Sequence, residues 1–453
     1  MSLIQPQPAG ATTTPEIYAP PGRITFDPWL VIAFFYPLTQ LLMVELGGQL
    51  YLMDFAGIVL LGFMIRQPGS LQRLAQIRVL LIFMGLWLLC QVATDIYRSI
   101  PMEDFLRGWG RIIFFAIQVC ALWLFLPRDR NYILAFGFGL SIALVFNVPE
   151  NFIESPWKFG YAQGLMMFTA CLLSVPSRLT NTLREFAPLI FLAVAAFLLT
   201  KVARSAFAIS TMTAGVCLAF VVLNKFGNAR EAMKPWMFAL LLIGGIGATG
   251  ILTTVYENAA DSGALGRDAQ VKYRKQSGGD LPLLLGGRPE SLISVVAIQD
   301  SPILGHGSWA KNRRYLEMYR TLRIRWGIDF PKTQYVKDRR IPAHSYFFGS
   351  WVESGIFGAI FWLYAFTIPL VATYWLLKRG RVLVPLGALL AISMVWNIPF
   401  SPFGATERFT AAFAIVTLLA IIKAARVKRG PGELLARNRR SRPAAYPPYA
   451  PAQ

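Results

Sequence analysis

The segment RIIFFAIQVCALWLFLPRDR, residues 111–130, shows the pattern that decides the fold. Between Ile112 and Leu126 its side chains are apolar except for Gln118, and charged residues follow at once. A helix of about twenty apolar residues is long enough to cross the hydrocarbon core of a bilayer. The pattern therefore predicts a membrane span, which we place at residues 111–126.

Similar stretches recur along the whole chain. Of its 453 residues, 55% are hydrophobic and 15% are charged, which is too apolar for a soluble protein of this length. The predicted spans are 29–46, 51–65, 79–95, 111–126, 131–146, 161–175, 187–200, 205–223, 236–255, 346–377, 382–396 and 408–422. The sequence therefore predicts an all-α integral membrane protein with about twelve transmembrane helices.

The short loops differ in their content of basic residues. The basic set of loops carries Arg66, Arg73, Arg78, Arg128, Arg130, Arg178, Arg184, Lys225, Arg230, Lys234, Lys378, Arg379 and Arg381. By the positive-inside tendency, these loops and both termini face the cytoplasm. Residues 1–28 and the basic tail 423–453 are predicted to be disordered cytoplasmic ends.

Residues 256–345 form the one long loop, between helices one to nine (29–255) and helices ten to twelve (346–422). We expect it to be partly helical and to face away from the cytoplasm. It holds fifteen Lys and Arg residues against nine Asp and Glu. Loops longer than about 60 residues escape the orientation rule. Such a basic surface suits an anionic partner, although charge facing anionic lipid headgroups would explain most of it equally well.

Three motifs lie in this loop or directly after it: GGRPES (286–291), AIQDSPILGHGSW (297–309) and PAHSYFFGSWVESGIFG (342–358). As an ordered set they resemble the signature of the O-antigen ligase/polymerase superfamily. That superfamily comprises O-antigen ligases, polymerases of surface polysaccharides and some protein O-oligosaccharyltransferases. The resemblance implies a GT-C-like fold in the bacterial inner membrane, with an active site that faces the periplasm.

A fourth stretch, KVARSAFAIS (201–210), resembles the helix start of the superfamily that contains a Ser-Arg pair. Here Ala203 precedes Arg204 and Ser205 follows it, so the match is imperfect. The entry to the sixth span, around Lys158, also departs from the Arg-Gly-rich pattern of the superfamily.

Cations are needed to transfer a sugar from a lipid diphosphate, because negative charge builds on the diphosphate as its bond to the sugar breaks. Arginine binds phosphate oxygens through two N–H groups and stays charged at any working pH. We expect Arg204 and Arg288, with Lys201, to bind the diphosphate. The alternatives are that Arg204 extends to the headgroups and that Arg288 forms a structural ion pair.

The chain has two histidines, His306 and His344. A base that deprotonates a sugar hydroxyl needs a pKa near ambient pH, which favours histidine. His344 lies where the loop returns to the membrane, and we expect it to be the base, against the alternative of an interfacial histidine. His306 lies between two glycines and is predicted to be a turn residue. Glu353 is expected to pair with an arginine or to hydrogen-bond within the bundle, and Lys158, Glu353 and His306 are possible accessory residues.

The resemblance implies metal-independent, inverting transfer of a glycan from undecaprenyl diphosphate to an acceptor hydroxyl on a polysaccharide or on lipid A core. No cofactor, metal site or nucleic-acid partner is expected. A single histidine in PAHSYF favours a polymerase slightly, because ligases often carry two. The alternatives are an O-antigen ligase and, from another class, a flippase that transports lipid-linked glycans. A flippase predicts charges along a central path near the bilayer midplane.

Overall fold

The structure is a computed structural model of the chain. It describes the residues 27–45, 48–148, 155–201, 203–226, 230, 232–264, 266–267, 270, 289–325, 340–380 and 383–426. Arg288 and the GGR part of the first motif therefore lie outside the described residues, as do nearly all of the predicted disordered ends.

The first predicted span begins as α1 (Pro28–Phe35) and continues as the 3-10 helix η1 (Tyr36–Leu41). Asp27 caps α1, because its side chain accepts a hydrogen bond from the Trp29 backbone N–H at 2.9 Å. A short antiparallel hairpin of β1 (Met43–Glu45) and β2 (Gln49–Tyr51) follows, with Val44 opposite Leu50. It leads directly into α2 (Leu52–Ile65).

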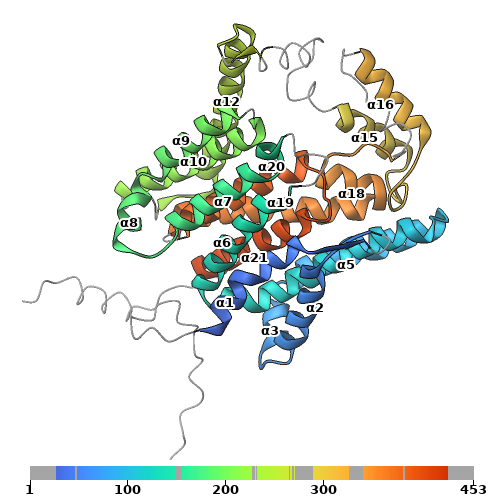
Figure 1. The fold of residues 1–453 in the computed structure, drawn as a ribbon, viewed down its shortest axis with the longest axis horizontal. Helices are drawn as coiled ribbons and strands as arrows, with labels where there is room; N and C mark the ends of the chain where they lie inside the picture. Colours follow the sequence, from blue (N-terminus) through green and yellow to red (C-terminus); the bar gives the residue numbers. More distant parts are fainter. Residues whose placement is uncertain are drawn as a thin grey trace, which may run out of the picture.

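The rest of the described chain is helical (Figure 1). In chain order the elements are α3 (Ser70–Ala75), α4 (Arg78–Tyr97), α5 (Met102–Phe125), η2 (Leu126–Arg128), α6 (Arg130–Phe146), the π-helical turn η4 (Trp157–Tyr161), α7 (Ala162–Leu173), α8 (Arg178–Glu185), α9 (Ala187–Thr200), α10 (Arg204–Lys225), α12 (Pro235–Asp261), α15 (Pro289–Asp300), α16 (Arg313–Arg325), α18 (Tyr346–Ser354), α19 (Ile356–Arg379), α20 (Val384–Phe400) and α21 (Glu407–Arg426).

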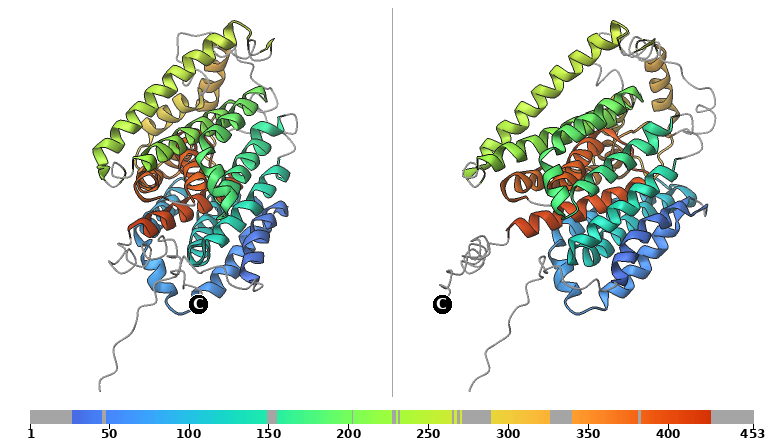
Figure 2. Two further views of the ribbon diagram at one scale, coloured as in Figure 1. Left: turned by 90° about the vertical axis from the view of Figure 1, so that its left-hand side faces the viewer. Right: turned by 60° about the vertical axis from the view of Figure 1, so that its left-hand side comes forward.

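The first predicted span, 29–46, is helical only as far as Leu41 and ends in β1. Each later predicted span lies over a helix, or over two consecutive ones, and most of the helices lie side by side in one bundle (Figure 2). Within the described residues, five helices are long and apolar enough to cross a membrane: α4, α5 with η2, α10, α19 and α21. A sixth is possible if α7 and α8 count as one broken span. The chain is thus an all-α protein with several membrane-span-capable helices, and twelve crossings remain a prediction.

The predicted continuous helix 346–377 is wrong, because the structure breaks it at Gly355 into α18 and α19. Gly355 has φ of 68°, a region that side chains with a Cβ rarely adopt. A Cβ at this position would lie 1.8 Å from the carbonyl oxygen of Ile303. The break therefore lets the loop before α16 approach the backbone between α18 and α19.

Aromatic side chains form the core where α4, α18 and α19 meet. Trp87 stacks on Phe361 with 5.0 Å between ring centroids, and Trp362 packs beside both. Both indole N–H groups are satisfied, since Trp87 donates to the Ser354 hydroxyl and Trp362 to the Ser350 hydroxyl, each at 2.8 Å. Buried tryptophans need such partners, and here they fix α18 to the bundle.

One ion pair is buried inside the bundle. Arg408 at the start of α21 pairs with Asp54 near the start of α2, and their side chains are 3% and 0% exposed. The Asp54 carboxylate also accepts the backbone N–H of Tyr51 at 2.9 Å. A charge at such a depth needs a partner, so the pair fixes α21 to α2.

Candidate functional site

Two of the motifs meet at a turn rich in glycine, residues 301–309, which we call the glycine turn. Gly305 and Gly307 have φ of 78° and 88°, the left-handed region that favours glycine. The backbone N–H of His306 donates to the Val352 carbonyl at 2.7 Å, and that of Gly307 donates to the Glu353 carbonyl at 2.9 Å. The glycine turn and the end of α18 therefore form one hydrogen-bonded unit, although they are far apart in the sequence.

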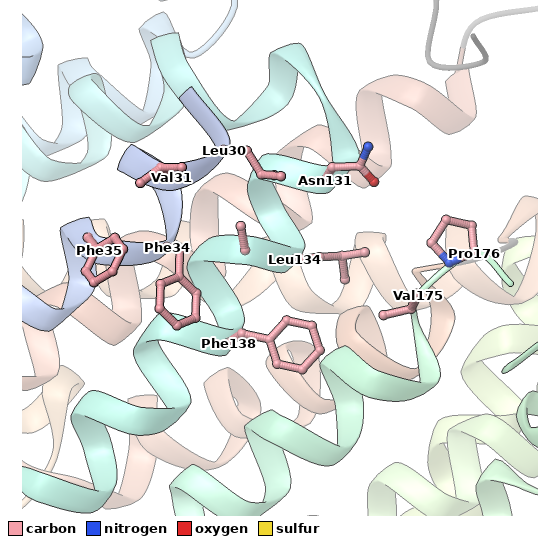
Figure 3. A pocket seen from close by; sticks show the side chains of 10 residues that line it. Leu30, Val31, Phe34, Phe35, Asn131, Leu134, Phe138, Val175 and Pro176 are labelled. Atoms are coloured by element: carbon pink, nitrogen blue, oxygen red, sulfur yellow. The ribbon is translucent and has the colours of Figure 1, made fainter. Parts of the chain in front are cut away.

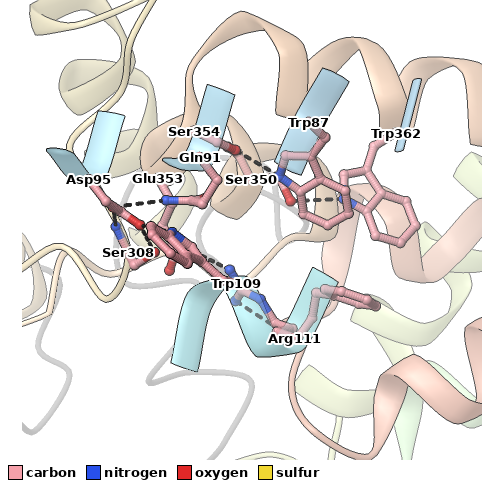
Figure 4. A network of polar contacts seen from close by, with 11 residues as sticks. Trp87, Gln91, Asp95, Trp109, Arg111, Ser308, Ser350, Glu353, Ser354 and Trp362 are labelled. Carbon is pink, nitrogen blue, oxygen red and sulfur yellow. Dashed lines mark hydrogen bonds and ion pairs between the residues drawn. The ribbon is translucent and has the colours of Figure 1, made fainter. Parts of the chain in front are cut away.

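Asp95 on α4 holds this unit in place (Figure 4). Its carboxylate accepts the backbone N–H and the hydroxyl of Ser308, both at 2.6 Å, and the indole N–H of Trp109 on α5 at 2.7 Å. Arg98, the residue that follows α4, donates to the Gly305 carbonyl at 3.0 Å. Hydrogen bonds that involve a charged group are stronger than those between neutral groups. The bonds that Asp95 accepts from Ser308 and Trp109 therefore fix the glycine turn to α4 and α5.

Arg111 on α5 reaches the same place and forms an ion pair with Glu353 of α18 (Figure 4). The two side chains are 12% and 17% exposed. Arg111 also donates from Nη1 to the Phe403 carbonyl at 3.4 Å, and its Nε is buried without a hydrogen-bond partner among the described residues. We call Arg111, Glu353, Trp309 and Arg340 the arginine cluster.

Trp309 is the aromatic platform of the arginine cluster. The guanidinium of Arg111 lies 5.5 Å from its ring centroid and that of Arg340 lies 5.6 Å away, both within the range of cation–π attraction. Trp309 has φ of 53°, which is unusual for a residue with a large side chain. Strained backbone of this kind is held in place by its surroundings and is often found at functional sites.

His344 lies at the start of α18 and is exposed. The next residue, Ser345, caps the helix, because its hydroxyl accepts the Phe348 backbone N–H at 3.0 Å. The same hydroxyl donates to the Ile398 carbonyl near the end of α20 at 2.9 Å. The segment before His344 is also held, since Ser294 of α15 donates to the Pro342 carbonyl at 3.0 Å. His344 is thus placed at the surface by fixed backbone on both sides.

Lys158, Lys201 and Arg204 lie where η4, α9 and α10 meet, and with Trp157 we call them the basic rim. The Lys201 ammonium lies 5.9 Å from the Trp157 ring and 5.5 Å from the Phe197 ring. The Lys158 ammonium lies 4.8 Å from the Phe159 ring. Arg204 is the first residue of α10 and is half-buried. The aromatic faces attract the ammonium groups and so hold them beside the ends of these helices.

The basic rim, His344 and the arginine cluster share one end of the bundle, which we call the site end. α10 packs against α20, and Phe220 near the end of α10 packs into the cluster around Val384 at the start of α20. The two helices are therefore antiparallel, so Arg204 lies toward the end of α20. The capping bond of Ser345 to Ile398 and the bond of Arg111 to Phe403 reach the same end of α20.

His306 occupies the turn position that its flanking glycines predict. Its Nε2 lies 2.7 Å from the Ala297 carbonyl, and its ring packs edge to face on Tyr315 at 5.4 Å. Burial, more than any nearby charge, lowers the pKa of His306 below its usual range. These contacts explain the position of His306 as that of a turn residue.

The sequence did not single out Arg111 or Trp309 as members of the site, and it offered Asp95 only as one of several residues near span ends that could line the same cavity or lie at the interface. A signal for Arg111 was present, because it is the charged first residue of the predicted span 111–126, and ionisable residues at such positions are functional candidates. Glu353 pairs with an arginine as expected, although the sequence could not say which one. The contribution of Arg288 remains a prediction.

Neither the apolar groove of Figure 3 nor a metal-ligating group of the described residues lies at the site end. An apolar groove of about 470 Å³ lies between α1, α6 and the residues after α7 (Figure 3). It includes Val175, which follows the end of α7, whereas the basic rim lies at the start of that helix. Within the described part of the chain, no group of three or more His, Cys, Asp or Glu side chains is placed to hold a metal ion.

The region around the site matches a known protein family. Residues 188–363 match the family described as O-antigen ligase. This region runs from α9 into α19 and contains Arg204, the glycine turn, His344 and Glu353. No curated protein matches the chain. Residues 188–363 of the chain therefore resemble the O-antigen ligase family, which is consistent with the resemblance of its motifs to the O-antigen ligase/polymerase superfamily.

Proposed function

We propose that the chain is a glycosyltransferase of the bacterial inner membrane that transfers a glycan from undecaprenyl diphosphate to an acceptor hydroxyl at the periplasmic face. The family match indicates a membrane glycosyltransferase of surface polysaccharide assembly. One observation best supports this assignment of the lipid-diphosphate donor and the hydroxyl acceptor. The basic rim, the arginine cluster and the exposed His344 all lie at the site end. Cations and a base are the groups that this chemistry needs.

In the proposed reaction, the acceptor hydroxyl oxygen attacks the anomeric carbon of the donor glycan. His344 takes the hydroxyl proton as the new carbon–oxygen bond forms. The bond between the anomeric carbon and the phosphate oxygen breaks, and its electron pair leaves with undecaprenyl diphosphate. Attack from the face opposite the leaving group inverts the anomeric configuration. An exposed histidine on fixed backbone suits this role, because the acceptor must approach from solvent.

Lysine and arginine side chains meet the charge of the diphosphate, so the proposed mechanism is metal-independent. Arg204 and Lys201 of the basic rim are the first candidates, with Lys158 beside them, and Arg288 is assigned the same role on its sequence alone. Arg111 adds a cation that the sequence had not suggested, because its guanidinium lies at the site end. A planar guanidinium binds two phosphate oxygens at once, which an ammonium group does not do.

Among acceptors we favour the growing polysaccharide, which makes the chain a polymerase, over lipid A core, which would make it a ligase. The single histidine of the PAHSYF segment supports this choice. Deletion of the gene would then leave core capped by single repeats, with loss of long chains. Full-length glycan that accumulates on its lipid carrier would instead assign a ligase.

The role of His344 is tested by glycan transfer in liposomes that contain the purified chain. The variant His344→Ala is expected to lower kcat by about 10²-fold or more, since general bases contribute factors of that size. Arg204→Gln should also slow transfer, whereas Arg313→Gln should not. Arg313 is the matched control, because it is a cation of α16 whose side chain is 79% exposed. A His344→Ala variant that keeps full activity would remove the assigned base.

A further inference from the structure

A polar cavity of about 410 Å³ lies at the end of the bundle opposite the site end. It is formed by α8, the end of α10, Arg230 and Gly380, the residue after α19. Its charged lining residues are Arg184, Glu185, Lys225 and Arg230. The side chains of Asn181 and Asn224 add amide groups. The lining therefore carries three cations against one carboxylate, an excess of positive charge that favours an anionic ligand.

The bend between α7 and α8 places α8 along one wall of the cavity. α8 runs at 118° to α7, so it lies across the end of the bundle instead of continuing the span. Ser177 starts α8 with a capping box, in which its hydroxyl accepts the Thr180 backbone N–H at 3.1 Å. This cap sets the start of α8, and Arg184, the penultimate residue of that helix, lies at the wall of the cavity.

The two arginines are held by carbonyl groups at helix ends. Arg184 donates to the carbonyls of Leu173 at 3.1 Å and Val175 at 3.3 Å, at the end of α7. Arg230 donates to the Leu377 carbonyl at 2.7 Å, near the end of α19, and lies 4.6 Å from the Phe220 ring centroid. These bonds fix the positions of both guanidinium groups. Because carbonyl groups are neutral, the bonds do not neutralise the positive charges.

An apolar surface continues from the cavity along α10. Phe220 and Val221 form the apolar wall of the cavity. On the same helix, Leu218 and Val222 are 53% and 42% exposed. Exposed apolar side chains on a membrane-span-capable helix face lipid tails. A ligand that fits both surfaces therefore has an anionic head and apolar chains.

We propose that this cavity binds the headgroup of an anionic phospholipid. The phosphate lies among Arg184, Lys225 and Arg230, and the acyl chains run along the exposed face of α10. Basic pockets between helices at the cytoplasmic side of membrane proteins are suited to such headgroups. The lipid site is distinct from the site end and does not depend on the proposed glycan transfer.

The proposal is tested by native mass spectrometry of the purified full chain. The protein is titrated with phosphatidylglycerol and, separately, with phosphatidylcholine, and the Kd of the first bound lipid is measured. Phosphatidylglycerol should bind more tightly. Lys225→Gln should weaken its binding about fivefold, the factor that corresponds to one basic residue near a membrane surface. Asn181→Asp, which adds a carboxylate from α8, should weaken it as well.

The matched control is Arg66→Gln, which removes an exposed cation at the end of α2, outside the cavity. It should leave the Kd unchanged within twofold. Equal losses for Lys225→Gln and Arg66→Gln would overturn the proposal, because they would show attraction by general charge. Displacement of the lipid by an excess of inorganic phosphate would assign the cavity to free phosphate and overturn the proposal too. Equal binding of the two lipids would have the same consequence.

Discussion

At the scale of single residues, Asp95 on α4 connects its helix to α5 and to the glycine turn at the site end. Its carboxylate accepts four hydrogen bonds, from Gln91, from Trp109 and two from Ser308. Removal of a buried acceptor leaves its donors without partners, at a cost of about 1–3 kcal/mol each for the most buried ones. Asp95→Ala should therefore lower the free energy of unfolding by about 3 kcal/mol.

Thermal unfolding in detergent measures this loss, and glycan transfer by the folded fraction measures its effect on the site. Glu103→Gln is the control, because Glu103 is a carboxylate of α5 whose side chain is 64% exposed. If Asp95→Ala and Glu103→Gln had the same stability, the glycine turn would not depend on Asp95.

His306 gives the glycine turn a dependence on pH. Its pKa is lowered in the folded chain, chiefly by burial, so near neutral pH the folded and unfolded chains both hold it neutral. As pH falls below about 6.5, the unfolded chain binds a proton before the folded chain does, and stability falls. His306→Gln should reduce the loss of Tm between pH 7.5 and pH 5.5. An unchanged loss in this variant would show that other groups cause it.

Single residues also mark the limit of what the sequence predicted. Candidates such as His344 and Arg204 could be named because their residue type and local motif carry information. The partners of Arg111 could not be named, since Glu353 and Trp309 lie more than 190 positions away in the chain. Contacts of that kind depend on how the helices pack, which no local pattern encodes.

At the scale of elements, the break between α18 and α19 lets the glycine turn approach the bundle. A Cβ at Gly355 would overlap the Ile303 carbonyl oxygen, and the φ of 68° disfavours any other residue. Gly355→Ala should therefore lower the free energy of unfolding by about 1–3 kcal/mol or more. Thermal unfolding in detergent tests this expectation.

Gly215 in α10 is the matched control, because an added Cβ there would meet nothing within 4 Å. Gly215→Ala should be neutral or slightly stabilising, since alanine favours a helix over glycine. Equal stability of the two variants would contradict the close approach of Ile303 to Gly355.

Helix positions were predicted well from the sequence, and their ends less well. Apolar stretches such as 111–126 are local, and α5 forms there because its backbone must satisfy its own hydrogen bonds in lipid. The break at Gly355 lies inside an apolar run, which by itself indicates one continuous helix. It arises from a loop that packs against the break, so it could not be read from hydrophobicity.

At the scale of the whole molecule, the predicted topology places His344 and Lys225 on opposite sides of the membrane. In a background without Cys90, Cys120, Cys171 and Cys217, a single cysteine at each position can be labelled in intact cells. His344→Cys should react with a thiol reagent that does not cross membranes, and Lys225→Cys should react only after the membrane is opened. Labelling of both positions from outside would contradict the predicted topology.

Formation of a glycosidic bond at the site end would distinguish a glycosyltransferase from a transporter. The most direct measurement uses proteoliposomes in which every chain presents the His344 side outward, with donor and acceptor glycans supplied only outside. A longer glycan should appear outside, with release of undecaprenyl diphosphate there. Movement of the intact donor across the bilayer without a new glycosidic bond would contradict the account and indicate a transporter.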